Sequence, residues 1–478
     1  MSSTKGNEGG LNTRLILAVM TAALFVSVFT NTMVNVAIPL IRNEFGISEA
    51  LAGWVITGYA VPFAVCVPIY GRISDLFSLK RVFAIGLAVL AVGLAICALA
   101  PTFSVLIAGR ALQGIGAGAI PALSFGAIAK LLPKGERGIA YGTLSSSVGV
   151  GSAAGPVLGG VISGFAGWQW LFVTTLVLTL IILSGALYIL PHSISDVSSE
   201  GASLSRLDLP GGLLLAAAAG LALFSVTRAE TVGPTSPIVW SGIVLAVAAA
   251  VAFAWRIRTA PEPFVDPGLF ASSTFVAAIF VGFLAQFANI GSLFLSPLLL
   301  EGTNGLAPAQ AGLVLAPGAV AVALLSPLVG NLSDRYGPWT VLPFGLTMML
   351  ASAFVLCSFV AGATAYLVAG GLLLLGIGYA GVNSPAANAA SEAVSRQTAG
   401  TGLGIYQLFF FMGSGSGPAV LGAVLAARSD ETREAINPLY TLQANPFSDA
   451  FLVAGAAVIV ALLIALRLGR RVGKTKRS

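Results

Sequence analysis

Long apolar runs alternate with short polar segments along the whole chain, and fourteen such runs can be counted. Each run is long enough to cross a bilayer as a helix, which takes about 20 residues. A segment in lipid must satisfy its own backbone hydrogen bonds, so runs of this length predict helices and exclude strands. We therefore expect an all-α, polytopic membrane protein with fourteen transmembrane helices near residues 15–40, 51–73, 82–100, 103–130, 139–165, 169–191, 209–227, 237–255, 273–300, 309–333, 339–360, 364–391, 399–426 and 448–468.

The basic residues predict the orientation of these helices, because cytoplasmic loops of membrane proteins carry an excess of Lys and Arg. With the N-terminus in the cytoplasm, nineteen of the 24 basic residues fall on the cytoplasmic side and four fall outside. The remaining one, Arg110, lies within a span. Both termini are therefore predicted to be cytoplasmic, with a basic C-terminal tail that could also contact anionic lipid headgroups.

Composition narrows the class of protein further. Hydrophobic residues make up 57% of the chain and charged residues only 9%, whereas about a quarter of residues are charged in soluble domains. The net charge of +6 is spread over the loops, which argues against a nucleic-acid partner. Phosphate loops, metal-ligand clusters and nucleophile constellations are missing from the sequence, so we expect neither an enzyme nor a cofactor or metal. The single histidine and the three cysteines are interpreted as bystander and packing residues: His192, Cys66, Cys97 and Cys357.

An internal repeat divides the chain in two. GRISD begins at Gly71 and GNLSD at Gly330; further on, GSAAGPVLGG (Gly151–Gly160) is matched by GSGSGPAVLGA (Gly413–Ala423). The offset is about 260 residues, whereas six spans with short loops need only about 190, which leaves room for two inserted helices. We predict a 6+2+6 arrangement: a six-helix bundle at 1–191, a linker with two extra helices at 192–272, and a second bundle with a basic tail at 273–478.

These motifs resemble those of the major facilitator superfamily, and in particular its fourteen-helix drug/proton antiporter branch, in the tetracycline-exporter-like subgroup. The resemblance covers essentially the whole chain. It rests on the loop signature at Gly71–Lys80 and Gly330–Gly337, the helix-4 signature at Arg110, Gln113, Gly114, Gly116 and Ala117, the antiporter signature at Gly151–Gly160, and the segments Thr32–Pro39 and Glu262–Phe270. The chain departs from the pattern at Ser78, at Asn31 (usually an Asp in the branch) and at Ser414 (near a helix-13 acid in tetracycline exporters).

Arg110 is the first candidate for the substrate or proton path. It lies about 10 Å into its span, where a charge costs roughly 2.5–3.5 kcal/mol, so it should face the protein interior. The resemblance implies a charge that helps to move protons or an anionic group; a purely structural arginine is the alternative. Gln113 lies one turn further on, and either Asn31 or Asn35 is predicted to face Arg110, unless these amides serve only helix–helix hydrogen bonding.

Two aspartates are predicted to act at a gate on the cytoplasmic side. Asp75 and Asp334 each follow the last turn of a helix, and Gly71 and Gly330 would let another helix approach closely. Their carboxylates could accept from N-terminal N–H groups of the next helix or pair with a nearby cation. The candidate cations are Lys80, Arg81 and Arg335. The alternative is a plain solvated turn.

The Gly-Pro pairs Gly155-Pro156 and Gly417-Pro418 remove one backbone hydrogen bond each and favour a kink. The surrounding glycines, Gly151, Gly159 and Gly160 in the first half, form a flat face for tight packing. The resemblance implies that this face meets the other half of the protein and limits leak. A passive kink is the alternative.

Further polar candidates for the path lie within spans, where buried amides need partners. They are Tyr59, Gln286, Asn289, Asn383 and Gln407. All 18 Asp and Glu residues, in contrast, fall in loops or at helix ends. If protons are coupled, the carriers must therefore be peripheral, or protons must act through competition at Arg110.

These observations predict a secondary active transporter that exports small amphipathic, drug-like molecules by alternating access in exchange for protons. An uncoupled or differently coupled exporter of neutral or anionic metabolites is the alternative, and a transporter-like sensor that binds without translocating is a further one. The expected partners are a small-molecule substrate, protons and the lipid bilayer, for a monomer in the plasma membrane, in bacteria the inner membrane.

Overall fold

The computed structural model describes residues 4–191, 208–233, 235–361, 363–428, 434–442 and 444–475. Fourteen helices in this part of the chain are long and apolar enough to cross a membrane, which confirms the predicted number. Along the chain, the elements are α1 (Thr4–Phe45), α2 (Glu49–Ala52), α3 (Trp54–Leu76), α4 (Leu79–Ala98), α5 (Phe103–Ala117), α6 (Ala119–Leu131), α7 (Arg137–Ala166), α8 (Gln169–Ile189), α9 (Leu209–Val232), α10 (Pro237–Thr259), α11 (Pro267–Ala271), α12 (Ser273–Gly302), α13 (Pro308–Tyr336), α14 (Pro338–Val355), the π-helical turn η3 (Leu356–Val360), α15 (Ala365–Glu392), α16 (Ala399–Ala427) and α17 (Asn445–Thr475).

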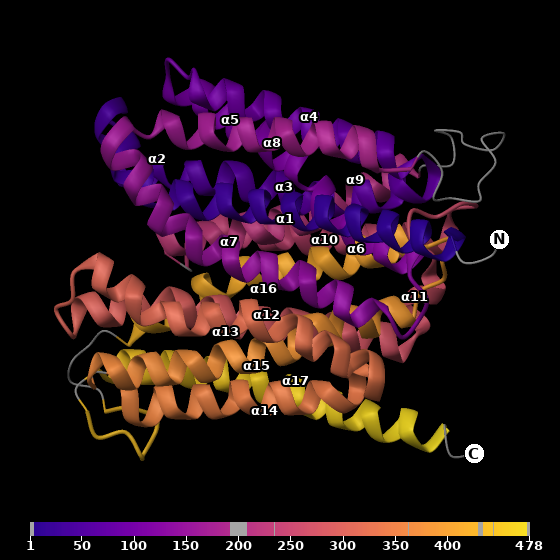
Figure 1. Cartoon of the computed structure of the whole chain (residues 1–478). Coiled ribbons are helices and arrows are strands. Elements are labelled where there is room, and N and C mark those ends of the chain that lie inside the picture. The colour runs from indigo at the N-terminus through magenta and orange to yellow at the C-terminus, as the bar shows by residue number, and fades with distance from the viewer. Residues whose placement is uncertain are drawn as a thin grey trace.

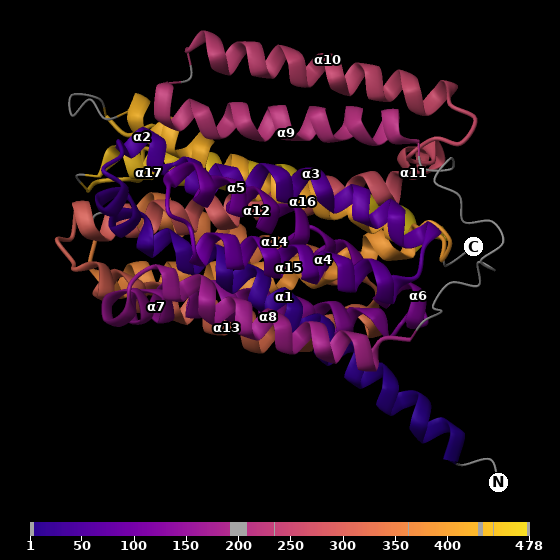
Figure 2. The same ribbon diagram turned by 90° about the horizontal axis from the view of Figure 1, so that it is seen from above.

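The long helices form two bundles that lie side by side, with a helix pair against one flank. The first bundle is built from α1 to α8 and the second from α12 to α17 (Figure 1). The inserted helices α9 and α10 form an outer layer, in which α10 packs on α9 and α9 packs on both α3 and α16 (Figure 2). The 6+2+6 arrangement is therefore confirmed. Both α1 and α17 have their free ends on the same side of the molecule, which is called the terminus side below (Figure 1).

Two predicted spans depart from a continuous α-helix. The span predicted at 103–130 divides at Gly118 into α5 and α6. Pro121 explains the break, because a proline ring inside a helix clashes with the carbonyl four residues earlier, here that of Ala117. The span predicted at 339–360 ends in the π-turn η3, where the carbonyl oxygen of Cys357 accepts from Asn437 Nδ2 (3.2 Å) and Ser448 Oγ (2.5 Å).

One carboxylate anchors the inserted helix pair. Asp208 caps the N-terminus of α9 by accepting from the backbone N–H of Gly211 at 3.2 Å. The same carboxylate forms an ion pair with Arg256 of α10 at 3.0 Å and accepts from the backbone N–H of Phe264 at 3.2 Å. Asp208 thus joins α9, α10 and the segment that leads into the second bundle.

Some residues used in the prediction of orientation lie outside the described residues. They are Arg206, Arg433, Lys476 and Arg477 among the basic residues, together with the single histidine, His192.

Candidate functional site

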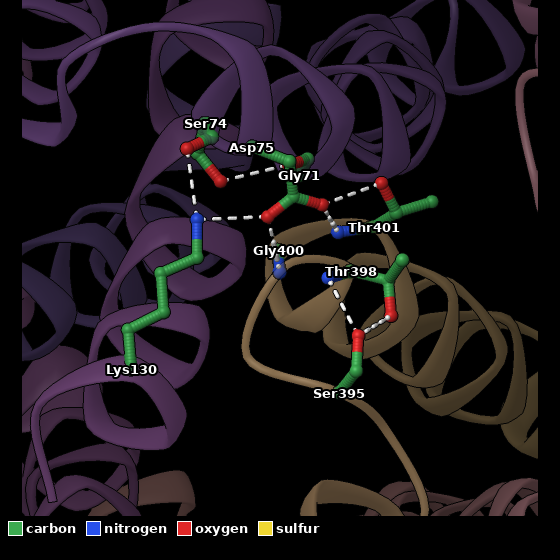
Figure 3. A network of polar contacts seen from close by, with 8 residues as sticks. All are labelled: Gly71, Ser74, Asp75, Lys130, Ser395, Thr398, Gly400 and Thr401. Atoms are coloured by element: carbon green, nitrogen blue, oxygen red, sulfur yellow. Dashed lines mark hydrogen bonds and ion pairs between the residues drawn. The ribbon is translucent and has the colours of Figure 1, made fainter. Parts of the chain in front are cut away.

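Asp75 joins the two bundles at the terminus side. It lies in the last turn of α3, and its carboxylate accepts from the backbone N–H groups of Gly400 (2.8 Å) and Thr401 (2.7 Å) at the start of α16 (Figure 3). The Thr401 hydroxyl donates a third hydrogen bond at 2.7 Å. These backbone N–H groups belong to the first turn of α16 and have no partner within the helix, so the carboxylate satisfies them and meets the positive end of the helix dipole.

The cation that pairs with Asp75 is Lys130, from the end of α6. Its Nζ lies 2.8 Å from the carboxylate and donates to the carbonyl of Ser74 at 2.9 Å (Figure 3). The prediction that Lys80 or Arg81 supplies this charge is wrong, because within the described residues the ion pair of Asp75 is made by Lys130. Both side chains of the pair are buried, at 3% exposure for Asp75 and 9% for Lys130.

Close backbone approach makes this contact possible. A Cβ added at Gly71 would collide with the carbonyl of Gly400, and one added at Gly400 would collide with Ser74 and Gly71. The predicted role of Gly71 in letting a helix approach is therefore seen in the structure, and the approaching helix is α16 of the other bundle. We refer to Asp75, Lys130, Gly400 and Thr401 as the first latch.

A second latch lies at the pseudo-symmetric position. Asp334, near the end of α13, accepts from the backbone N–H groups of Gly138 (2.7 Å) and Ile139 (2.9 Å) at the start of α7. Asn388 Nδ2 lies at 3.5 Å from the same carboxylate. Gly330 packs backbone to backbone on Gly138, as Gly71 does on Gly400.

Arg335 was predicted to belong to this gate, and the structure does not support that prediction. Its guanidinium lies 5.5 Å from the ring of Tyr336, and the Arg335 side chain is exposed. Within the described residues, Asp334 makes no ion pair, so the second latch lacks the cation that the first latch has in Lys130.

The two latches hold the bundles together at the terminus side in a reciprocal way. The first joins α3 of the first bundle to α16 of the second, and the other joins α13 of the second bundle to α7 of the first. Each carboxylate binds the second and third residues of the partner helix, after the caps Thr398 and Glu136. Arg137 adds a contact between bundles by donating to the carbonyl of Ser391 at 3.1 Å.

Sequence reasoning missed Lys130, Thr401, Asn388 and Arg137 in these contacts. The internal repeat does contain a signal for the two helix starts that bind the carboxylates. Gly138 and Gly400 are 262 residues apart (400 − 138), as are Gly155 and Gly417 (417 − 155), so the repeat equates the two helix starts. No comparable signal points to Lys130, because its contact depends on where α6 ends in space.

Arg110 is fully buried (0% exposed) and is held by neutral groups. Its Nε donates to the carbonyl of Val55 at 2.9 Å and its Nη1 donates to Gln113 Oε1 at 2.7 Å. Its Nη2 lies 3.5 Å from Asn31 Oδ1, and the guanidinium lies 4.5 Å from the centre of the Tyr59 ring. No carboxylate contacts it within the described residues, so its positive charge is balanced only by dipoles and an aromatic face.

Of the two asparagines predicted to face Arg110, only one does so. Asn31 makes the expected contact, whereas Asn35, one turn further along α1, is exposed and makes no hydrogen bond to Arg110. Gln113 joins the site as expected and also donates from Nε2 to the carbonyl of Gly93 at 3.4 Å.

The glycines of the antiporter signature pack within their own bundle. Gly151, Gly155 and Gly159 of α7 face α1, where added Cβ atoms would meet Phe29, Thr32 or Met33. Gly413 and Gly417 of α16 face α12 in the same way, while Gly160, Pro156 and Pro418 take no part in these close approaches. The prediction that this face meets the other half is therefore wrong here: glycines spaced four apart share one helix face, and α1 or α12 covers that face.

The polar candidates of the second bundle are buried and separate from Arg110. Gln286 accepts from the hydroxyl of Tyr379 at 2.6 Å. Three others are 2–6% exposed and make no hydrogen bond to Arg110: Asn289, Asn383 and Gln407. Within the described residues, no three His, Cys, Asp or Glu side chains lie together in a way that could hold a metal.

Two pseudo-symmetric six-helix bundles, a flanking helix pair and reciprocal latches between the bundles define the class: a polytopic membrane transporter. The chain belongs to the Major Facilitator Superfamily, whose family model matches residues 20–418 and 278–478. The predicted resemblance to this superfamily is thereby confirmed.

Similar proteins include two that are named for drug resistance and one that is named as a riboflavin transporter. Multidrug resistance protein Stp of Mycobacterium tuberculosis is 31% identical over 424 residues, 88% of this chain and 78% of that protein. Lincomycin resistance protein LmrB of Listeria monocytogenes is 29% identical over 364 residues, 76% of each. Riboflavin transporter RibZ of Clostridioides difficile is 26% identical over 374 residues, 78% of this chain and 79% of that protein.

Solved structures show the same fold. The human organic anion transporter MFSD10 superposes with a TM-score of 0.70 at 15% identity, over 95% of this chain and 99% of that chain. The proton:xylose symporter XylE superposes with a TM-score of 0.68 at 16% identity, over 96% of each chain.

Proposed function

We propose that this protein is a secondary active exporter of small amphipathic molecules that works by alternating access. The observation that carries the proposal is the pair of reciprocal latches at Asp75 and Asp334. Both join the bundles at one side of the membrane, because each carboxylate binds the first turn of a helix from the other bundle. The multidrug-resistance relatives support export as the direction and drug-like molecules as the substrates.

In this proposal the terminus side is cytoplasmic, in a bacterium the cytoplasmic face of the inner membrane. The excess of Lys and Arg predicted there supports this orientation. With both latches closed, the cytoplasmic ends of the bundles are held together, and substrate exchange takes place from the other side.

Proton exchange is the proposed driving force, and the latch carboxylates are the proposed proton carriers. Protonation would remove the charge that binds two backbone N–H groups at each latch and, at the first latch, the ion pair with Lys130. In each step of such a cycle, binding of one proton would break one latch. Coupling of this kind needs no carboxylate deep within a span.

A second candidate function is export of neutral or anionic metabolites. The buried guanidinium of Arg110, with no carboxylate in contact, favours it, because an uncompensated positive charge repels cationic substrates. The similarity to a riboflavin transporter adds support for such substrates.

Transport in proteoliposomes with an imposed pH gradient tests both candidates. The full chain is reconstituted, and uptake of cationic, neutral and anionic compounds, with riboflavin among the neutral ones, is followed with and without the gradient. Gradient-driven uptake of amphipathic drugs supports the first proposal. Transport that does not respond to the gradient contradicts proton exchange, and saturable binding without any transport contradicts both candidates and favours a sensor.

A further inference from the structure

A serine of α7 makes a hydrogen bond to the other bundle deep within the membrane. The hydroxyl of Ser146 donates to the backbone carbonyl of Ala323 in α13 at 2.5 Å. Ser146 lies nine residues beyond Arg137, the first residue of α7 (146 − 137), which is about 14 Å along the helix axis at 1.5 Å per residue. The contact therefore lies about halfway across a hydrocarbon core that is about 30 Å thick, well beyond the latch at the start of the same helix.

Pro327 explains why this carbonyl is available. In an α-helix the carbonyl of Ala323 would accept from the N–H group of residue 327, four positions later, but proline has no N–H group. A carbonyl without a partner inside the membrane costs free energy, so it needs a donor from elsewhere. Ser146 supplies that donor from the other bundle.

The bond lies toward the deep end of a stripe of small residues along which α7 packs on α13. An added Cβ at Gly142 would collide with the backbone of α13, and one at Gly149 would meet side-chain atoms of the same helix. Ser146 lies between these two glycines on the same face of α7, since positions three and four apart are neighbours. Further along α7, Gly151 and Gly159 face α1 instead. Among the described residues, Ser146 makes the deepest hydrogen bond between α7 and α13.

Ser146 can change its partner without losing a hydrogen bond. Serine and threonine hydroxyls inside helices can donate to the carbonyl four residues earlier, as Thr143 does to Ile139 in the same helix at 2.9 Å. A rotation about χ1 of Ser146 would direct its hydroxyl to the carbonyl of Gly142 in the same way. Water that enters as the bundles part can then donate to the carbonyl of Ala323. Both groups therefore have a partner in the closed and in the open state.

The internal repeat keeps the proline in both halves but the hydroxyl in only one. Pro68 lies three residues before the glycine of the G-x-[IL]-S-D motif in α3, as Pro327 does in α13. Gly404 of α16 packs on Pro68 as Gly142 of α7 packs on Pro327. The offset that relates these two glycines is 262 residues (404 − 142), and it places Leu408 at the position of the serine (408 − 262 = 146). The hydroxyl is therefore specific to the seam between α7 and α13.

We propose that Ser146 is a positioning residue of transport. Its hydroxyl closes the deep end of the gate at the terminus side by binding the carbonyl that Pro327 leaves free, and it turns to the carbonyl of Gly142 when the bundles part. This inference rests on the proposed alternating-access function and adds a contact that neither aspartate latch contains. The contact can break and form again in every cycle, because no donor is left unpaired in either state.

Distance measurements between spin labels on the full-length protein in lipid nanodiscs test the proposal. Labels at position 188 in α8 and position 340 in α14, both exposed at the terminus side, report on the separation of the bundles after the three cysteines have been replaced. All variants carry Asp334→Asn, which weakens the second latch and brings closed and open distances into a measurable range. Loss of one neutral hydrogen bond in Ser146→Ala is expected to raise the ratio of open to closed molecules about three- to tenfold.

A control and a double variant separate this contact from a general effect on the helix. Ser147→Ala is the matched control, because the hydroxyl of Ser147 donates to the carbonyl of Leu144 within α7 at 2.7 Å, and its ratio should equal that of the parent. Pro327→Ala supplies the N–H group that proline lacks, so the carbonyl of Ala323 finds its partner inside α13. Adding Ser146→Ala to Pro327→Ala should then change the ratio by less than about twofold.

The outcomes distinguish failure of this inference from failure of the proposed function. An unchanged ratio in Ser146→Ala, an equal shift in Ser147→Ala, or the full effect of Ser146→Ala in the Pro327→Ala background overturns the role of Ser146. Alternating access stands in each of these cases as long as the parent shows both distances. A parent that shows a single distance at every pH and substrate concentration tested overturns both proposals.

Discussion

The first latch makes a quantitative prediction for Asp75→Asn. The carboxylate has four partners: the N–H groups of Gly400 and Thr401, the Thr401 hydroxyl, and the ammonium of Lys130. An asparagine side chain has a single oxygen to offer, and its NH₂ group would point at donors. The substitution therefore leaves Lys130 without its counter-ion and at least one N–H group without an acceptor.

The size of the effect follows from burial. Both side chains of the ion pair are nearly inaccessible, at 3% and 9% exposure, so solvent does not screen the loss. The ion pair with Lys130 lies within the first bundle, and the contacts that cross to α16 are the three hydrogen bonds from Gly400 and Thr401. The ammonium of Lys130 keeps the amide oxygen on its side, so the NH₂ group replaces Oδ2 and both bonds from Thr401 are lost, at about 1.5–3 kcal/mol each. Since each 1.4 kcal/mol is a tenfold change, the ratio of latched to unlatched molecules should fall roughly a hundredfold or more. The bundles themselves should remain folded, because these hydrogen bonds lie between them.

Distance measurements between spin labels test this prediction. Labels at position 81, exposed at the start of α4 in the first bundle, and at position 397, exposed just before α16 in the second, are introduced after Cys66, Cys97 and Cys357 have been replaced. In Asp75→Asn the short distance should give way to a longer one. The control Asp266→Asn changes an exposed carboxylate that caps the short helix α11 and should leave the distances unchanged. An unchanged distribution in folded Asp75→Asn protein would refute the latch.

Three further predictions follow from the same geometry. Asp334→Asn should also favour a longer distance between α7 and α13, but it should destabilise the latched state by only about 1–3 kcal/mol, because the described partners of Asp334 are neutral. If the same spin-label experiment gives an effect as large as that of Asp75→Asn, the two latches do not differ in strength. Gly142→Ala should separate α7 from α13 and slow transport, because the added Cβ would collide with the backbone of α13. In the control Gly164→Ala the added Cβ meets open space, so this variant should transport normally. Asn31→Asp would give Arg110 a carboxylate partner and should lower the KM for cationic substrates and alter the pH dependence of transport; if neither changes, Arg110 does not influence substrate charge.

Much of the fold could be predicted because lipid leaves few alternatives. An apolar run of sufficient length has to become a helix, and the repeat offset requires two extra helices. The interruption at Gly118 was less predictable. Proline is tolerated inside many spans of this chain, for example Pro62 and Pro156, so Pro121 by itself does not say that its helix is interrupted.

In the candidate site, the sequence predicts the residues that a repeated motif places at a helix end, but not the partners that other helices bring to them. Asp75 and Asp334 were found because a repeated G-x-[IL]-S-D places a carboxylate at a helix end in both halves. The partners were not, since Lys130 and Thr401 come from α6 and α16, and only the packing of the bundles brings them to α3. The antiporter glycines show the same limit: their face was predicted, but which helix covers it depends on the arrangement of α1 and α7.

The two seams differ in more than their latches, and this difference bears on how the bundles separate. Helix α9 packs on both α3 and α16, which carry the first latch, and it is held to α3 by Arg228 over Trp54 at 4.5 Å and to α16 by Leu223 against Gly415. The seam between α7 and α13 lies on the far side of the molecule from α9 and α10 (Figure 2). The first seam is therefore bridged by a helix, and its latch contains an ion pair made within the first bundle, whereas among the described residues the second latch has no ion pair. The second seam is held instead by further hydrogen bonds between the bundles, such as those from Ser146 to the carbonyl of Ala323 and from Arg137 to the carbonyl of Ser391.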